Sequence, residues 1–150
     1  MSRLLIAIAL TAIVGPTARA TDNTTTSHTS AVKIKLTIDN KILTATLADN
    51  GTARDFASLL PLTLTMNDLF GREKFGHLPR GISDKGKRTH TYEIGDIAYW
   101  SPGPDVAIYY HHDGEQIPDP GIIAIGKIDS GVEALNVRGS MKVTMELMRK

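Results

Sequence analysis

Apolar and polar residues alternate along most of this chain, a pattern typical of strands with one buried and one solvated face. This alternation, or a short apolar run, predicts strands at residues 32–38, 43–47, 62–66, 94–100, 106–110, 122–128 and 141–147. No strand–helix–strand repeat appears, so we expect a mainly β fold, one antiparallel sheet of about seven or eight strands. Closing that sheet into a barrel would leave no exposed strand edge.

A different period appears directly after the second of these strands. Apolar residues recur at helical spacing over about residues 52–60, and strict alternation resumes after Pro61. This predicts one short helix. It should end before Pro61, because the residue before a proline is driven out of helical geometry. Either Asn50 or Thr52 can cap its first turn. A shorter helical turn is expected near residues 131–135.

The pattern dissolves between residues 67 and 93, where large apolar residues are scattered among glycines. We expect a long, partly packed excursion over the surface. Loops of this length in compact domains are usually functional or mobile. The alternative is a cover over one open end of the core.

The start of the chain has the features of an export signal. Arg3 supplies a positive charge, and an apolar stretch follows over residues 4–14, which is too short to cross a bilayer comfortably. Ala18 and Ala20 form a cleavage site of small residues, so residues 1–20 are predicted to be a cleaved signal peptide. The alternative is an uncleaved membrane anchor.

After that signal, residues 21–30 have nothing apolar to bury and are predicted to be a flexible leader to a single domain at residues 31–150. Loss of Arg3 and Arg19 with the signal leaves 15 of the 17 basic residues against 16 acidic ones. This balance argues against nucleic acid or an anionic membrane as the main partner. The sequence has no cysteine, and so no disulfide or thiolate metal site. We expect a bacterial periplasmic or secreted protein with no membrane insertion after cleavage.

No complete catalytic or metal-binding motif occurs in the sequence. The run from His111 to Glu115 contains metal-ligand residue types, but adjacent strand residues point to opposite faces and Asp-Gly pairs are common in turns. A hairpin turn is therefore favoured there over a metal site. A Gly-x-Ser-x-Gly elbow and a phosphate-binding loop are both missing. We assign no catalytic residue, no metal and no cofactor.

Aromatic residues provide the best candidates for ligand contacts. Tyr99 and Trp100 are adjacent on one predicted strand, and Tyr109 and Tyr110 on the next. Alternation places the members of each pair on opposite faces, so one aromatic pair should fill the core while the other lines an outer surface or a mouth. Plain packing is the alternative role for all four. Arg80 is a further candidate, because it lies in the irregular stretch between residues 67 and 93, which could border the barrel mouth.

Short runs in a particular order carry a family resemblance: Asn50–Phe56, Leu59–Thr63, Glu73-Lys74, Leu78-Pro79, Gly95–Trp100, Ala107–Tyr110 and Gly126–Leu135. In this order they resemble the small bacterial cyclophilin-like fold proteins, from about Ile34 to Val143. The family usually has proline where Gly51 stands, a minor departure at a helix start. The resemblance implies a closed antiparallel cyclophilin-like β-barrel of about eight strands with a helix over one end. It implies no reaction, because fold does not fix function.

Two motifs of true cyclophilins are missing, namely Phe-His-Arg-x-Ile and Phe-Met-x-Gln-Gly-Gly-Asp. The run Phe75–Ile82 has similar residue types in a different spacing. The leading hypothesis is therefore a non-catalytic exported module that binds a small molecule or a proline-containing peptide. The alternatives are a peptidyl-prolyl cis–trans isomerase or folding helper, and a structural domain for protein–protein contact.

Overall fold

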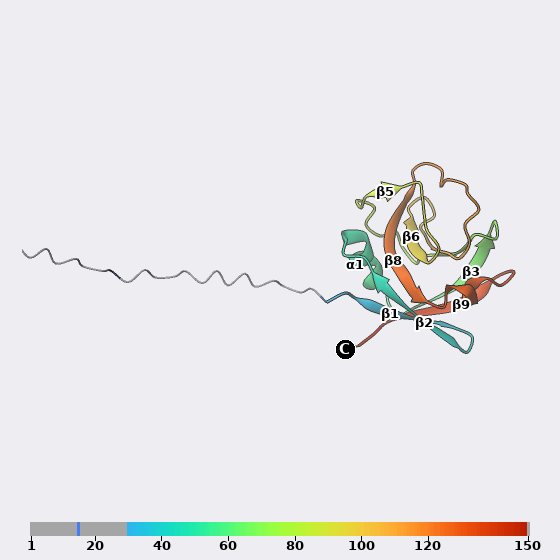
Figure 1. Cartoon of the computed structure of the whole chain (residues 1–150), viewed down its shortest axis with the longest axis horizontal. Coiled ribbons are helices and arrows are strands. Elements are labelled where there is room, and N and C mark those ends of the chain that lie inside the picture. Colours follow the sequence, from blue (N-terminus) through green and yellow to red (C-terminus); the bar gives the residue numbers. More distant parts are fainter. Residues whose placement is uncertain (1–14, 16–29, 150) are drawn as a thin grey trace, which may run out of the picture.

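Eight antiparallel strands close into a barrel in the computed structural model, which describes Gly15 and residues 30–149 (Figure 1). The order around the barrel is β2–β1–β9–β3–β4–β7–β6–β8, and β8 pairs with β2 to close it. The short β5 is added to β8 outside this ring. The expected barrel is thus confirmed. The strands are β1 (Lys33–Ile38), β2 (Lys41–Leu47), β3 (Leu62–Leu69), β4 (Glu73–His77), β5 (Arg88–Thr89), β6 (Asp96–Trp100), β7 (Asp105–Tyr109), β8 (Ile122–Ser130) and β9 (Met141–Leu147).

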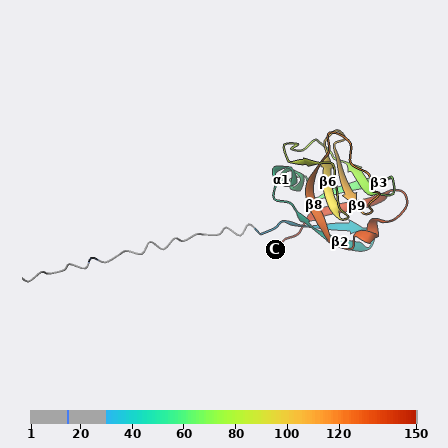
Figure 2. The ribbon, with the colours of Figure 1, turned by 45° about the horizontal axis from the view of Figure 1, so that its top comes forward.

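The predicted helix is present as α1 (Gly51–Ala57), beside β8 in both ribbon views (Figures 1 and 2). It ends earlier than expected, and the residues from Ser58 to Pro61 make a turn into β3. Phe56 from this helix is fully buried in the barrel core. The expected helical turn is the 3-10 helix η1 (Val132–Leu135).

Asn50 is the residue that starts α1 and fixes it to the barrel. Its side-chain oxygen accepts a hydrogen bond from the Ala53 N–H at 2.8 Å. Its side-chain nitrogen donates to the Ala124 carbonyl in β8 at 2.9 Å. One side chain therefore satisfies a free helix N–H and connects the helix to the sheet.

Replacing Asn50 with alanine should lower the free energy of unfolding by about 1–2 kcal/mol, because the helix cap and the bond to β8 are both lost. Urea denaturation followed by circular dichroism measures the change. The matched control is Asn40→Ala, in the exposed β1–β2 turn, which should leave stability nearly unchanged. Equal effects of the two substitutions would contradict a special role for Asn50.

Apolar side chains form two clusters, one on each side of the barrel wall. The inner cluster fills the barrel and includes Ile34, Phe56, Ile97 and Tyr99. The outer cluster lies on the opposite face of β4, β7, β6 and β8, and consists of Tyr92, Ala98, Ala107, Tyr109, Ile117 and Ile122, with Phe75 and Trp100 partly buried against it. These central strands are therefore buried on both faces.

The irregular excursion expected at residues 67–93 is a wrong prediction in part. β3 runs on to Leu69, all of β4 lies in this stretch, and β5 follows near its end. The alternation is hidden in β4 because its inward positions are Lys74 and Gly76, while its outward Phe75 is covered by the outer cluster. A strand buried on both faces has no polar side to reveal its period.

The hairpin turn expected between His111 and Glu115 is also wrong. The strands on either side of it, β7 and β8, are not paired with each other, since β6 lies between them. Residues 110–121, which we call the covering segment, instead cross the outer face of the barrel. Ile117 anchors this segment in the outer cluster, and its N–H donates to the His90 carbonyl at 2.8 Å.

The predicted signal peptide apart from Gly15, its cleavage site at Ala18 and Ala20, and the predicted leader apart from Ser30 lie outside the described residues. Within the part of the chain that is described, no helix has the length and apolar character needed to span a bilayer.

Candidate functional site

A pocket of about 220 Å³ opens on the outer face of the barrel, between β4, β6 and β7 on one side and the covering segment on the other. Its lining is mainly apolar and aromatic, which is typical of sites for small organic ligands. One basic and two acidic side chains, Arg72, Glu73 and Asp105, also line the pocket. The principal apolar contributors are Phe70, Phe75, Trp100, Tyr109, Ile117 and Ile122.

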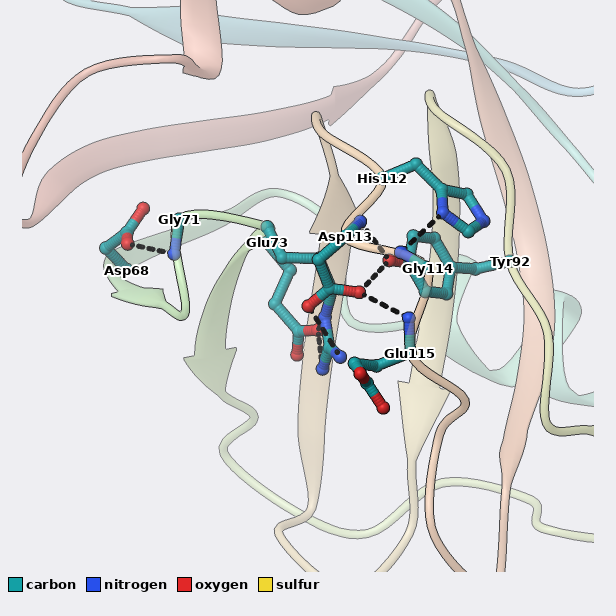
Figure 3. Close-up of polar contacts among 9 residues, drawn as sticks. Asp68, Gly71, Glu73, Tyr92, His112, Asp113, Gly114 and Glu115 are labelled. Carbon is teal, nitrogen blue, oxygen red and sulfur yellow. Dashed lines mark hydrogen bonds and ion pairs between the residues drawn. The ribbon is translucent and has the colours of Figure 1, made fainter.

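Phe70 forms part of the rim and is held there in an unusual backbone conformation. It occupies the β3–β4 turn with φ at 57°, a left-handed value that is uncommon for bulky residues. The residue is 76% exposed. Asp68 supports the turn by accepting a hydrogen bond from the Gly71 N–H at 2.9 Å (Figure 3). The turn thus presents a large apolar ring to solvent at the pocket edge.

A buried ion pair between Arg72 and Glu73 forms one end of the pocket. The Arg72 Nε and Nη2 atoms lie 2.9 and 2.7 Å from the same Glu73 carboxylate oxygen. Both side chains are less than a tenth exposed. The guanidinium carbon also lies 5.4 Å from the centre of the Phe70 ring and 5.9 Å from that of Tyr109. Arg72 is therefore held by charge and by aromatic faces together.

Asp113, which belongs to the covering segment, adds a further carboxylate at this end of the pocket (Figure 3). One carboxylate oxygen accepts hydrogen bonds from the Tyr92 hydroxyl and the Glu115 N–H, both at 2.9 Å. The other lies 3.5 Å from the Arg72 Nη1 atom. Tyr92 stacks on Tyr109 with ring centres 4.2 Å apart. The covering segment is thus fastened to the strands by polar and aromatic contacts.

The environment shifts several pKa values at this end. Burial raises the pKa of Glu73 above its ordinary value, although Arg72 opposes the shift. Burial works against charge on Arg72, yet Glu73 and Asp113 raise its pKa overall. The pKa of Asp113 is lowered by the Glu115 N–H and the Tyr92 hydroxyl, and burial raises that of Tyr109. Arg72 and Asp113 are accordingly charged at neutral pH, and Tyr109 is neutral.

Asp105 lies at the opposite end of the pocket from this ion pair. It begins β7, directly across from Trp100 on β6 and from His77 on β4. Its side chain is 17% exposed, and among the described residues its one side-chain partner is the exposed His77, at 3.1 Å. This carboxylate lacks the close cationic partner that Glu73 has in Arg72.

The structure brings two of the five candidate ligand residues together. Trp100 and Tyr109 both line the pocket, as members of the aromatic pair on the outer face. Tyr99 is buried in the barrel, where its hydroxyl accepts a hydrogen bond from the Ile82 N–H at 3.3 Å. Tyr110 packs against the inner cluster and donates to Asp68. The alternation argument therefore correctly separated the two faces.

Arg80 lies outside the pocket lining. Its guanidinium contacts the Asp55 carboxylate at 2.8 Å and the Ser58 hydroxyl at 3.1 Å. Asp55 also accepts a hydrogen bond from the Ser83 N–H at 2.8 Å, and these contacts lower the pKa of Asp55, with Arg80 the main cause. Arg80 thereby attaches the segment after β4 to α1.

Of the lining residues, the sequence analysis named only Trp100 and Tyr109. Among those that it missed, the most important for the site are Phe70, Arg72, Glu73 and Asp105. The first three fall in the stretch interpreted as irregular, so no face could be assigned to them. The one available signal was an adjacent Arg-Glu pair next to a glycine, which is usually a solvated turn. Within the described residues, no group of three or more His, Cys, Asp or Glu side chains is placed to hold a metal ion.

Comparison with known proteins identifies the family to which this fold belongs. The sequence pattern of the Cyclophilin-like family matches residues 36–146. The chain belongs to this family. The cyclophilin-like barrel is also seen in the solution structure of a hypothetical protein from Archaeoglobus fulgidus, with a TM-score of 0.63 and 21% identity, over 79% of this chain and 95% of that chain. No curated protein matches the sequence. Likeness at this identity establishes the fold alone, so the function of the cyclophilin-like barrel must be argued from its own pocket.

Proposed function

We propose that this cyclophilin-like domain is an exported, non-catalytic binding module. In this proposal a small organic molecule, or a short peptide segment with an apolar side chain, occupies the outer-face pocket. The observation that carries the proposal is the aromatic lining of this 220 Å³ pocket, with Phe70 exposed at its rim. The expected export rests on the N-terminal sequence, through the apolar run and the small residues Ala18 and Ala20.

The backbone of Phe70 supports a binding role for the rim. A left-handed conformation costs a bulky residue free energy, and such strain persists where the surrounding structure compensates for it, often at ligand sites. Because the Phe70 ring is exposed, burial of its apolar surface does not offset this cost. A ligand that covers it would remove this apolar surface from water, which favours binding.

We favour a non-catalytic role because the two buried charged groups of the pocket, Arg72 and Glu73, are already engaged with each other. Arg72 uses two of its nitrogens on Glu73, and its third contact is with Asp113. Glu73 is the buried carboxylate at this end, and it too is occupied by Arg72. A site built for acid–base chemistry would instead direct such a group at the space for the substrate.

The tryptophan gives a direct test of this function. Trp100 lines the pocket and is the single tryptophan of the whole sequence. Tryptophan emission, excited where the four tyrosines do not absorb, therefore reports chiefly on this pocket. We expect saturable changes in emission when the mature protein is titrated with small aromatic compounds or proline-containing peptides. Emission that does not change with any compound, together with an unchanged melting temperature, would contradict the proposal.

Replacing Phe70 with alanine should weaken ligand binding about two- to tenfold, because one aromatic contact at the rim is lost. The fluorescence titration measures it. Since Phe70 is exposed, folding should be unaffected. The control is Ile42→Ala, which removes a side chain that is 66% exposed on β2 and outside the pocket lining. The same affinity in both variants would remove Phe70 from the site.

A second candidate function is prolyl cis–trans isomerisation, which one observation favours. Arg72 lines an apolar slot, and its Nη1 atom is held loosely, at 3.5 Å from Asp113. A donor beside an apolar slot is what the twisted amide of the transition state requires. A protease-coupled assay on proline peptides decides between the two functions. Rates equal to the uncatalysed control exclude isomerisation, while a rate that falls in Phe70→Ala supports it.

A further inference from the structure

The pocket has two ends of different electrostatic character, and this difference indicates the chemistry of its ligand. At one end the charge of Arg72 is offset by Glu73 at 2.7 Å and by Asp113 at 3.5 Å. At the other end, the one side-chain partner that Asp105 has within the described part of the chain is the exposed imidazole of His77, at 3.1 Å. The lining therefore holds one basic and two acidic side chains, Glu73 and Asp105. The uncompensated charge is the negative one at Asp105.

An aromatic ring stands next to that carboxylate. Trp100 and Asp105 are directly opposite each other on β6 and β7, and both belong to the outward-facing set that includes Ala107. Directly opposed residues on one face have Cβ atoms about 5 Å apart, so their side chains can contact the same group. Indole has the most favourable aromatic face for a cation. A carboxylate beside an indole is thus a suitable site for an organic ammonium group.

Two of the other three aromatic rings in the lining already have a cation beside them. The Phe70 and Tyr109 rings have the Arg72 guanidinium within 6 Å of their centres. The third ring, Phe75, is a phenyl ring, which binds a cation less strongly than indole does. Between the two ends, Phe75, Ala107, Ile117 and Ile122 offer apolar surface. A ligand with an apolar body and a cation at one end matches this arrangement.

On the basis of the proposed function, we propose that the pocket selects organic ammonium compounds: the ammonium group lies between Asp105 and Trp100, and an apolar or aromatic body lies along Ala107 and Ile117. Anions are disfavoured, because the one cationic side chain of the lining is neutralised by its own partners. His77 sits at the edge of this site as an exposed and replaceable partner of Asp105.

The test uses three probes with the same phenyl ring: 2-phenylethylammonium, 2-phenylethanol and phenylacetate. Each is titrated into the mature, ¹⁵N-labelled protein, and the indole N–H signal of Trp100 is followed by NMR. We expect the ammonium compound to bind about fivefold or more tightly than the alcohol, and the carboxylate to bind weakest. In Asp105→Asn the ammonium and the alcohol should bind equally, within about twofold.

A control variant tests whether the preference for the ammonium compound depends on Asp105 in particular. Asp84→Asn removes another carboxylate, one that is 62% exposed and outside the pocket lining, and should preserve the preference for the ammonium compound. The ratio of two affinities within one variant is unaffected by a partial loss of folded protein.

Equal affinity for ammonium and alcohol in the natural protein would overturn the inference and leave the binding function standing. Tightest binding of phenylacetate would overturn it in favour of Arg72. Trp100 signals that respond to none of the probes would overturn the inference; the binding function itself falls only if the wider fluorescence and melting screen is also negative.

Discussion

Replacing Arg72 with methionine should lower the free energy of unfolding by about 3–5 kcal/mol at pH 7. The substitution removes the cation and leaves the Glu73 carboxylate buried, with its side chain only 8% exposed. A buried charge without a partner costs far more than the pair itself contributes, because neither water nor a cation stabilises it. Methionine keeps much of the packing against Phe70 and Tyr109, so the loss of charge dominates the effect. Urea denaturation at pH 7 measures it.

The second substitution Glu73→Gln, made in the Arg72→Met background, tests the reason for the loss. Removing both charges of a buried pair is often close to neutral, so the double variant should recover most of the lost stability. A double variant as unstable as Arg72→Met alone would show that packing, and not the unpaired carboxylate, causes the loss.

The pH dependence has a defined sign. Burial raises the pKa of Glu73 in the folded protein above its ordinary 4.5, and loss of Arg72 removes the main opposing influence. A carboxyl with a raised pKa binds its proton more tightly in the folded state, so the unfolding free energy increases as pH falls through that pKa. The stability deficit of Arg72→Met relative to the natural protein should therefore shrink from pH 7 toward pH 5. A deficit that stays constant over this range would contradict the assignment to Glu73.

Replacing Lys74 with methionine should also cost about 3–5 kcal/mol. The Lys74 side chain is fully buried inside the barrel and donates to Asp68 at 2.9 Å, to the Gly139 carbonyl at 2.8 Å and to the Val137 carbonyl. Methionine satisfies none of these acceptors. The same residue connects β4 with the segment between η1 and β9, so that segment should lose its anchor.

The matched control for this prediction is Lys35→Met. Lys35 pairs with Glu146 at 2.9 Å, and both side chains are more than a third exposed. Exposed pairs of this kind contribute at most about 1 kcal/mol. Hydrogen exchange provides a second readout, because the Asn136 and Val137 N–H groups donate to the Glu133 and Leu135 carbonyls. Protection of these two amides should fall in Lys74→Met and persist in Lys35→Met. Equal losses of stability in the two variants would contradict the burial argument.

The fold was predictable from sequence because its signals are local. Strand alternation at β1, β2, β3 and β9 assigns each side chain to a face without knowledge of its neighbours. The helix α1 was also predicted, with either Asn50 or Thr52 as its cap, and the structure uses Asn50. The same local rule put Tyr99 and Trp100 on opposite sides of the barrel wall, which the structure confirms.

The pocket was only partly predictable because its parts come from distant segments. Trp100 and Tyr109 could be named as candidates from their strands alone. Glu73 could not, because it begins β4, a strand that is buried on both faces and shows no alternation. Phe70 and Arg72 could not, because they lie in the turn before β4, where no strand period assigns a face. The path of the covering segment was missed as well, since a turn signal at Asp113-Gly114 does not reveal what the turn packs against.

The sequence by itself determined the antiparallel strands, one short helix, and which aromatic residues share a side of the wall. These follow from side-chain period, which is a property of a few consecutive residues, while closure of the sheet into a barrel was what the family resemblance implied. Only the tertiary structure decided that a second apolar cluster exists outside the barrel, that Arg72 is buried against Glu73, and that Asp105 stands beside Trp100. Those outcomes depend on strand order and on how residues 110–121 cross the sheet, both of which are fixed by burial between residues far apart in the chain.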